Sequence, residues 1–101
     1  MSVREYIFGG EIVMDAENGN DAFYGKIDSP EMMGQVIRRK RSETGIKQEV
    51  AAGMCGVGTK FFSQLENGKE TAELGKTLQV LRRMGLELYI YPRSANPFKD
   101  R

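Results

Sequence analysis

The spacing of apolar residues is helical in the middle of the chain. Met33 is followed by apolar residues three and four positions later, ending at Ile37, which is the pattern of one buried helix face. Ser29 and Pro30 precede this face and suit a helix start, because serine caps free amides and proline fits the first turn. We therefore predict a helix that begins after Ser29 and stops at Gly45.

Two shorter helices are predicted next, over about residues 47–55 and 59–66, with Gly-Val-Gly between them. The apolar residues expected on the inner side of the first are Val50, Ala51 and Met54. Those expected on the inner side of the second are Phe62 and Leu65. Asn67 and Gly68 close the second helix.

A fourth helix is predicted from a cap at Thr71 to a stop at Gly85. Its apolar residues recur at spacings of three and four, and they are Leu74, Leu78, Leu81 and Met84. The single cysteine, Cys55, is expected to be a small packing residue because one cysteine forms no internal disulfide.

The apolar period changes from helical to two after Gly85, which predicts one strand over residues 86–92, stopped by Pro92. Within the chain only residues 6–14 and 22–27 can supply a partner strand. The other solution is the same strand of a second copy, paired across a two-fold axis. This predicts a dimer formed through Leu86, Leu88, Tyr89, Ile90 and Tyr91.

The N-terminal residues alternate loosely, and Asn18-Gly19 between them is a strong turn signal. We read residues 1–28 as either a two-stranded hairpin or a frayed arm. The predicted organisation is therefore an arm over 1–28, a main domain over 29–92 and a tail over 93–101.

Composition narrows the possible functions. The 101 residues suffice for one domain, and the absence of histidine excludes histidine-based zinc sites and catalytic triads. No apolar run approaches the roughly 20 residues that span a bilayer. We expect a cytosolic protein that is not an enzyme and needs no cofactor or metal.

Charge is divided unevenly along the chain. Residues 1–31 hold two basic and seven acidic residues, a net charge of −5, and residues 32–101 hold thirteen and seven, a net charge of +6. Affinity for nucleic acid comes largely from lysine and arginine that replace counterions on phosphates. The basic body is therefore compatible with DNA binding, although many solvated surfaces are also mildly basic.

Residues 46–68, IKQEVAAGMCGVGTKFFSQLENG, resemble the Cro/phage-repressor (Xre) helix-turn-helix family. The matching features are Gln48 near the start of the first helix, alanine at its centre, the Gly-Val turn and the closing Phe-Ser-x-Leu-Glu-x-Gly. The resemblance implies a mainly α fold, a lambda-repressor-like domain of four to five helices.

The continuation to residue 89 is similar to the HipB-like antitoxins, including the related Y4mF type. The likeness covers about residues 29–92. It implies a homodimer with a shared C-terminal strand that binds its own operator and neutralises a HipA-like kinase toxin. Operator DNA, a second copy and the toxin are therefore the expected partners, with no membrane.

The second helix of this motif enters the major groove, with its N-terminal residues at the base edges. The expected base contacts are Gly58, Thr59, Lys60, Ser63 and Gln64. The expected phosphate contacts are Gln48, Arg38, Arg41, Lys47 and Lys69. The chain departs from the family pattern at Lys47, where threonine or serine is usual, and at Gly58, where a polar residue is common.

Two other interpretations stay open at this point. One is a stand-alone, phage-like transcriptional regulator without a toxin. The other is a protein-interaction module whose helix-turn-helix does not bind DNA.

Overall fold

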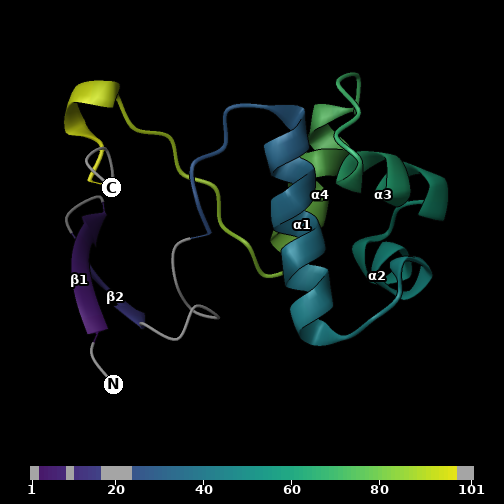
Figure 1. Cartoon of the computed structure of the whole chain (residues 1–101), viewed down its shortest axis with the longest axis horizontal. Coiled ribbons are helices and arrows are strands. Elements are labelled where there is room, and N and C mark those ends of the chain that lie inside the picture. Colours follow the sequence, from purple (N-terminus) through teal and green to yellow (C-terminus); the bar gives the residue numbers. More distant parts are fainter. Residues whose placement is uncertain (1–2, 9–10, 17–23, 98–101) are drawn as a thin grey trace. The chain divides into compact units, whose positions relative to one another are not determined.

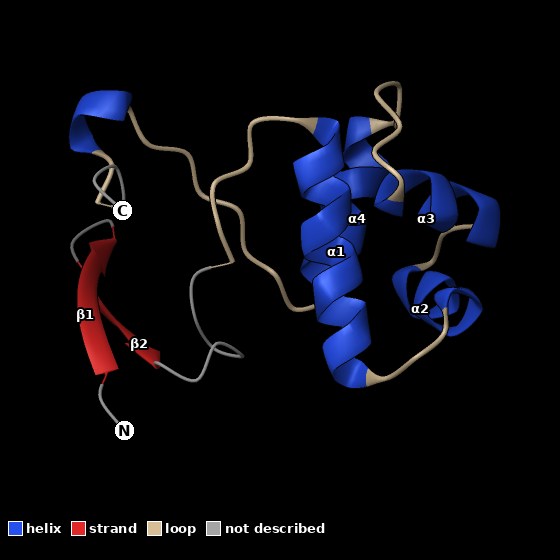
Figure 2. Cartoon of the chain, viewed as in Figure 1, coloured by secondary structure: helices blue, strands red, loops and turns tan. Residues whose placement is uncertain are grey.

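The computed structural model describes residues 3–8, 11–16 and 24–97, and Figure 1 traces the whole chain. These residues belong to two structural units, one formed by residues 1–24 and 89–101 and the other by residues 25–88. The second unit holds four α-helices, which Figure 2 shows in blue. They are α1 (Pro30–Thr44), α2 (Gln48–Cys55), α3 (Thr59–Glu66) and α4 (Leu74–Arg83). This agrees with the mainly α fold predicted from the sequence.

The two ends of α1 confirm their sequence signals. The Ser29 hydroxyl accepts a hydrogen bond from the Met32 amide at 3.1 Å, so it caps the first turn. Gly45 adopts a left-handed conformation with φ 72°, and its amide donates to the carbonyls of Arg41 and Ser42. The helix is therefore closed at both ends by local bonds.

The predicted cap of α4 at Thr71 is wrong. Thr71 lies in an exposed turn, and the helix begins at Leu74, after Glu73 in the N-cap position. The Glu73 carbonyl accepts both the Thr77 amide at 3.0 Å and the Thr77 hydroxyl at 2.8 Å. The chain needs these extra residues because it turns at Lys69–Ala72 before α4 can start.

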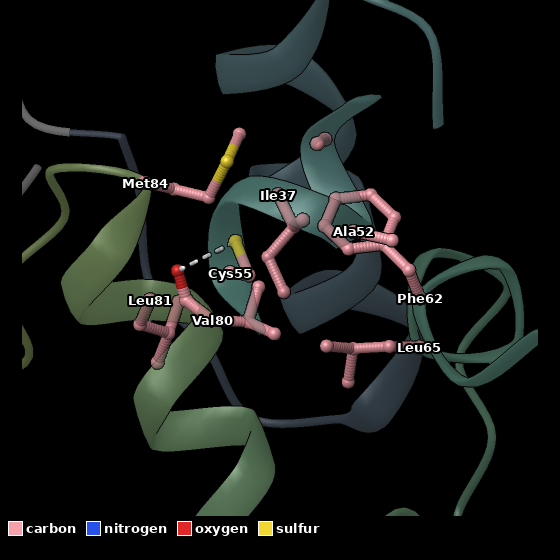
Figure 3. Packing of buried hydrophobic residues seen from close by; sticks show 9 residues of the cluster. Ile37, Ala52, Cys55, Phe62, Leu65, Val80, Leu81 and Met84 are labelled. Atoms are coloured by element: carbon pink, nitrogen blue, oxygen red, sulfur yellow. Dashed lines mark hydrogen bonds between the residues drawn. The ribbon is translucent and has the colours of Figure 1, made fainter. Parts of the chain in front are cut away.

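The core lies among all four helices, and Figure 3 shows its side chains pointing toward one another. Its buried apolar members are Ile37, Ala51, Ala52, Cys55, Phe62, Leu65, Val80, Leu81 and Met84. Cys55 has the packing role expected, because burial raises the pKa of its thiol, which donates to the Val80 carbonyl at 3.9 Å. A neutral buried thiol behaves as a small apolar side chain.

Four apolar residues expected in the core are exposed instead. Val50 and Met54 on α2 and Leu74 and Leu78 on α4 all retain more than a third of their accessible surface. The inner face of α2 is Ala51, Ala52 and Cys55, and that of α4 is Thr77, Val80, Leu81 and Met84. The two helices were predicted at about the right positions, but part of each buried face was assigned wrongly, because apolar residues lie on more than one side of each helix.

Two glycines permit close packing against α1. A Cβ at Gly34 would lie 2.6 Å from the Leu65 carbonyl oxygen and would also meet the Glu66 carbonyl oxygen, so α1 crosses the end of α3 with no room for a methyl group. Gly68 has φ 82°, and a Cβ there would lie 2.9 Å from Glu31 Cα. The reversal of the chain after α3 therefore requires glycine at position 68, as predicted.

The unit formed by residues 1–24 and 89–101 contains a two-stranded antiparallel sheet of β1 (Val3–Phe8) and β2 (Glu11–Ala16). A hairpin was one of the two predicted arrangements, but its strands are misplaced in the prediction. Residues 6–14 are not one strand, since Phe8 pairs with Glu11 and only Gly9 and Gly10 join the strands. Two glycines suit a two-residue hairpin link, and the turn predicted at Asn18-Gly19 lies outside the described residues.

Residues 86–92 do not form the predicted strand in the single chain. They are a loop that leads to a short 3-10 helix, η1 (Arg93–Ala95), and residues 24–27 are also loop rather than strand. The physical reason is that a strand requires a partner for its backbone groups. Leu86 is the inner end of this loop, because its amide donates to the Leu81 carbonyl at 2.9 Å and its side chain packs against the core.

Candidate nucleic-acid interface

The helix-turn-helix consists of α2, a short turn and α3, and local bonds fix its geometry. Gly56 ends α2 in a left-handed conformation with φ 72°. The following Val57 amide donates to the Ala52 carbonyl at 3.0 Å, and the Val57 side chain packs against the core beneath the turn. Gln79 of α4 donates to the Cys55 carbonyl at 2.6 Å, which closes the end of α2 from the other side.

Helix α3 has one face toward the core and one face toward solvent. Phe62, Leu65 and Glu66 are buried. Of the residues predicted to contact bases, Gly58, Thr59 and Lys60 are exposed at the N-terminal end of the helix, and Ser63 and Gln64 are half-buried. At about 100° per residue, Lys60 and Gln64 fall near the middle of this outer face. Lys60 and Gln64 therefore share the outer face with Ser63 at its flank, and Gly58 and Thr59 lie at the N-terminal end of the helix.

Both helices of the motif begin without a side-chain cap. Lys47 is the N-cap residue of α2 and Gly58 that of α3, and neither makes a capping side-chain bond. The first amides of a helix have no partner within the helix and carry a partial positive charge. At these two positions the departures from the family pattern leave backbone amides available to an anion.

A buried carboxylate anchors the far end of α3. The Glu66 side chain is fully buried, and Arg41 of α1 binds it through two nitrogens, with Nε 2.6 Å from Oε2 and Nη2 3.0 Å from Oε1. Gln48 of α2 donates from Nε2 to the same Oε1 at 2.8 Å. One side chain thus connects three helices.

The charge of Glu66 is stabilised by this network. Burial alone would raise its pKa, but the hydrogen bonds from Arg41 and Gln48, with the charges of Arg41 and Arg38, outweigh burial and lower it. Arg41 in turn has a raised pKa, mainly from its hydrogen bond to Glu66, so both groups stay ionised. The pair is therefore ionised near neutral pH and forms an ion pair between α1 and α3.

The five predicted phosphate contacts have different surroundings. Arg41 is largely buried and all three of its side-chain nitrogens have protein partners, because Nη1 also donates to the Ile46 carbonyl at 3.0 Å. Arg38 keeps about half of its side chain exposed while it donates to Asn67 Oδ1 at 3.0 Å. Lys47 and Lys69 are exposed, and Gln48 is half-buried. The structure gives Arg41 an internal role and leaves the others at the surface.

Glu66 is the member of this site that sequence reasoning missed. It stands in the quoted motif, but its burial depends on a partner 25 residues earlier on α1. Phe61 of α3 packs at the edge of the core, and the Lys76 ammonium of α4 lies 5.6 Å from the centre of its ring. This side chain therefore links α3 to α4.

Comparisons with known proteins agree with this geometry. No family model matches the chain. The uncharacterized HTH-type transcriptional regulator y4mF of Sinorhizobium fredii is 42% identical over 65 residues, which cover 64% of this chain and 86% of that protein. Within the described residues no helix is long and apolar enough to cross a membrane.

Solved structures of HipB share the fold. A HipB-O4 20mer complex and a HipA-HipB-O2-O3 complex each superpose with a TM-score of 0.62 at 22% sequence identity, over 67% of this chain and 96% of the solved chain. The likeness confirms the lambda-repressor-like helix-turn-helix fold that the sequence motif indicated.

Proposed function

The chain belongs to the HTH-type transcriptional regulators related to y4mF, and from this premise we propose that it is a dimeric, sequence-specific repressor and an antitoxin. In this proposal it binds an operator ahead of its own gene and neutralises a HipA-like kinase toxin in the bacterial cytosol. Residues 29–92 act as the DNA-binding and dimerisation domain, with an arm over 1–28 and a tail over 93–101.

The outer face of α3 is the observation that carries the DNA-binding proposal. Lys60 and Thr59 stand exposed at the start of this helix, while Glu66 anchors its end. A helix held in this way can enter the major groove, which is wide enough for it, and reach base edges with its N-terminal residues. Lys60 can bond the acceptors of guanine, and Thr59 can offer a hydroxyl or its methyl group.

Phosphate contacts are proposed around this helix. Arg38, Lys47 and Lys69 supply exposed cations, and the uncapped amides at the start of α2 supply neutral donors beside Gln48. Arg41 stays in this set with less freedom than the others, because Glu66 and Ile46 bind three of its five N–H groups.

Dimerisation is proposed through the C-terminal segment and one flank of α4. Leu88 and Ile90 retain 48% and 90% of their accessible surface, and Leu74 and Leu78 are also exposed. A second copy that pairs residues 86–92 across a two-fold axis would satisfy the backbone of this segment and cover apolar side chains of it, and the exposed flank of α4 would need an apolar surface of its own. Such a dimer presents two copies of α3 to half-sites about one helical turn apart.

The toxin proposal has different support, because it draws on the resemblance to HipB-like antitoxins. One of the HipB structures with this fold is a complex of HipA, HipB and DNA. If a kinase-like protein is encoded beside the gene for this chain, co-expression should yield a stable complex of the two. Separate elution of the two proteins would favour the stand-alone regulator.

The test of the repressor proposal is a salt titration of binding to the DNA upstream of its own gene, with a scrambled duplex of equal length as control. We expect preference for the upstream duplex and a steep loss of affinity with salt, because a dimer doubles each phosphate contact. Equal, weak binding to both duplexes would contradict it and favour the protein-interaction module. Deletion of residues 86–92 should lower the mass in solution to that of a monomer, and an unchanged mass would contradict the dimer interface.

A further inference from the structure

The residues that follow α3 bring Lys69 back beside Gln64, on the outer face of that helix. Gly68, in its left-handed conformation, reverses the chain, and the next amide, that of Lys69, donates to the Gln64 carbonyl at 3.0 Å. This six-to-one bond is a known helix-ending arrangement. It sets the Lys69 backbone beside Gln64, one turn back along α3.

The Lys69 side chain then makes a second bond to the same residue. Its Nζ lies 3.1 Å from the Gln64 side-chain oxygen, Oε1. A lysine ammonium has three donors and no acceptor, so only the oxygen of the Gln64 amide can face it. The amide nitrogen, Nε2, which is the donor end, is consequently turned away from Lys69.

We propose that Lys69 is a positioning residue for base recognition, because its bond to Gln64 turns the oxygen of that glutamine toward Lys69 and leaves the amide nitrogen, a donor, as the end that reads the major groove. The inference rests on the proposed DNA-binding function and specifies one of its base contacts. A glutamine free to use both ends bonds adenine twice, accepting from N6 and donating to N7. With Oε1 turned toward Lys69, the two ends of the amide are no longer both free to align with adenine, and the N–H groups of Nε2 suit the acceptors of guanine (N7 and O6) or thymine (O4).

A phosphate contact by Lys69 is compatible with this role. The ammonium has three N–H groups, and the bond to Gln64 uses one of them. Lys69 can therefore bind a phosphate and hold Gln64 at once. The two roles differ in their consequences: a phosphate contact changes affinity for every sequence equally, whereas orientation of Gln64 changes base preference at one position.

The experiment selects preferred duplexes from a double-stranded DNA library with a randomised core. The position that Gln64 reads is the one at which Gln64→Ala loses its preference. The wild type should prefer guanine or thymine there. Lys69→Ala should raise the affinity for adenine relative to guanine by about fivefold or more, the lower end of what a two-bond base contact supplies.

Two further variants sharpen the result. Lys69→Arg keeps a donor-only partner and should retain the wild-type preference. Lys69→Glu offers only an acceptor, so it should turn Nε2 inward and shift the preference toward cytosine or adenine, whose amino groups donate. Relative preference is the readout, so a uniform loss of affinity from the changed charge does not affect it. Lys26→Ala, which removes an exposed lysine from outside the helix-turn-helix, is the charge-matched control.

The outcomes separate this inference from the proposed function. If Lys69→Ala weakens binding equally for all sequences, Lys69 contacts phosphate alone and the inference is wrong, while the repressor proposal stands. The inference is also wrong if Gln64→Ala changes preference at no position. If the wild type itself selects no sequence, the proposed function fails first. Thermal unfolding of each variant ensures that the comparison is made between folded proteins.

Discussion

The two ends of α3 have opposite surroundings. At its C-terminal end Glu66 is fully buried and bound by Arg41 and Gln48, and α1 crosses without room for a methyl group at Gly34. At its N-terminal end the helix has no side-chain cap, and Thr59 and Lys60 project into solvent. Within its eight residues, α3 thus has one end held by an ion pair and one end exposed to solvent.

This difference separates positioning from recognition within one helix. Specific recognition requires that the backbone of the helix keeps its position while the exposed side chains exchange water for DNA. The anchored end supplies that fixed backbone, and the open end supplies groups that are not needed for folding. Substitutions at the two ends should therefore have opposite consequences for stability and for DNA binding, and the following predictions run from the largest effect on stability to the smallest.

Arg41→Met should give the largest loss, about 3–5 kcal/mol in the free energy of unfolding, because it removes the main charged partner of a buried carboxylate and leaves it only Gln48 at 2.8 Å and Arg38 at 3.5 Å. The matched control is Arg39→Met, which removes an exposed pair with Glu43 at 3.2 Å on the same helix. That change should cost less than about 1 kcal/mol. Urea denaturation measures both, and equal losses would contradict an anchor at Glu66.

Gly34→Ala should destabilise by about 3 kcal/mol, at the upper end for overpacking, since the new methyl group meets two backbone carbonyls. Gly53→Ala is the control, because nothing lies within 4 Å of a Cβ on this exposed glycine of α2. It should stabilise by about 0.5–1 kcal/mol, since alanine is the better helix former. A neutral effect of Gly34→Ala on the thermal midpoint would show that α1 and α3 can separate at no cost.

Acid should weaken the anchor without any substitution. The pKa of Glu66 is lowered by folding, so its contribution is complete above the unfolded value of about 4.3 and is lost as the pH falls toward the folded pKa. The loss should be smaller than in Arg41→Met, because a protonated carboxyl still accepts hydrogen bonds.

The matching measurement is the free energy of unfolding of the wild type and of Glu66→Gln as a function of pH. The difference between the two proteins should be constant near neutral pH and should narrow below about pH 4.3. A difference that stays constant through the acid range would mean that Glu66 is not ionised in the folded protein.

Lys60→Ala should have the smallest effect on stability, within about 0.5 kcal/mol, because the side chain is exposed. Affinity for the preferred duplex should nevertheless fall roughly five- to a hundred-fold, with relaxed preference at one base pair. Unchanged base preference in a binding assay would remove Lys60 from the set of base contacts.

Most helices could be predicted because their signals are local. Ser29, Gly45 and Gly56 each act through bonds to residues within four positions, so the sequence carries the whole cause. The helix-turn-helix was predicted for a similar reason, since its residues are consecutive. The start of α4 was not, because the turn at Lys69–Ala72 takes up residues that the capping rule assigns to the helix.

Features that depend on distant partners could not be predicted. Burial of Glu66 requires Arg41, which no spacing rule connects to it, and the exposure of Leu74 depends on which flank of α4 meets the other helices. The strand over residues 86–92 has the right alternation, but a strand also needs a neighbour, which a single chain does not supply for it. Sequence pattern therefore indicates what a segment can form, and packing decides whether it does.

Because α2 and α3 are short, the proposed DNA-binding surface depends on the folded state of the whole helical domain. Each has eight residues, and an isolated helix of that length is marginal in water. The α3 surface consequently exists only while the core is intact, and an unfolded chain carries no residual reading helix. In the proposed repressor, a protease that digests transiently opened chains would remove DNA-binding capacity in step with the protein, so the duration of repression would follow the thermodynamic stability of a small core.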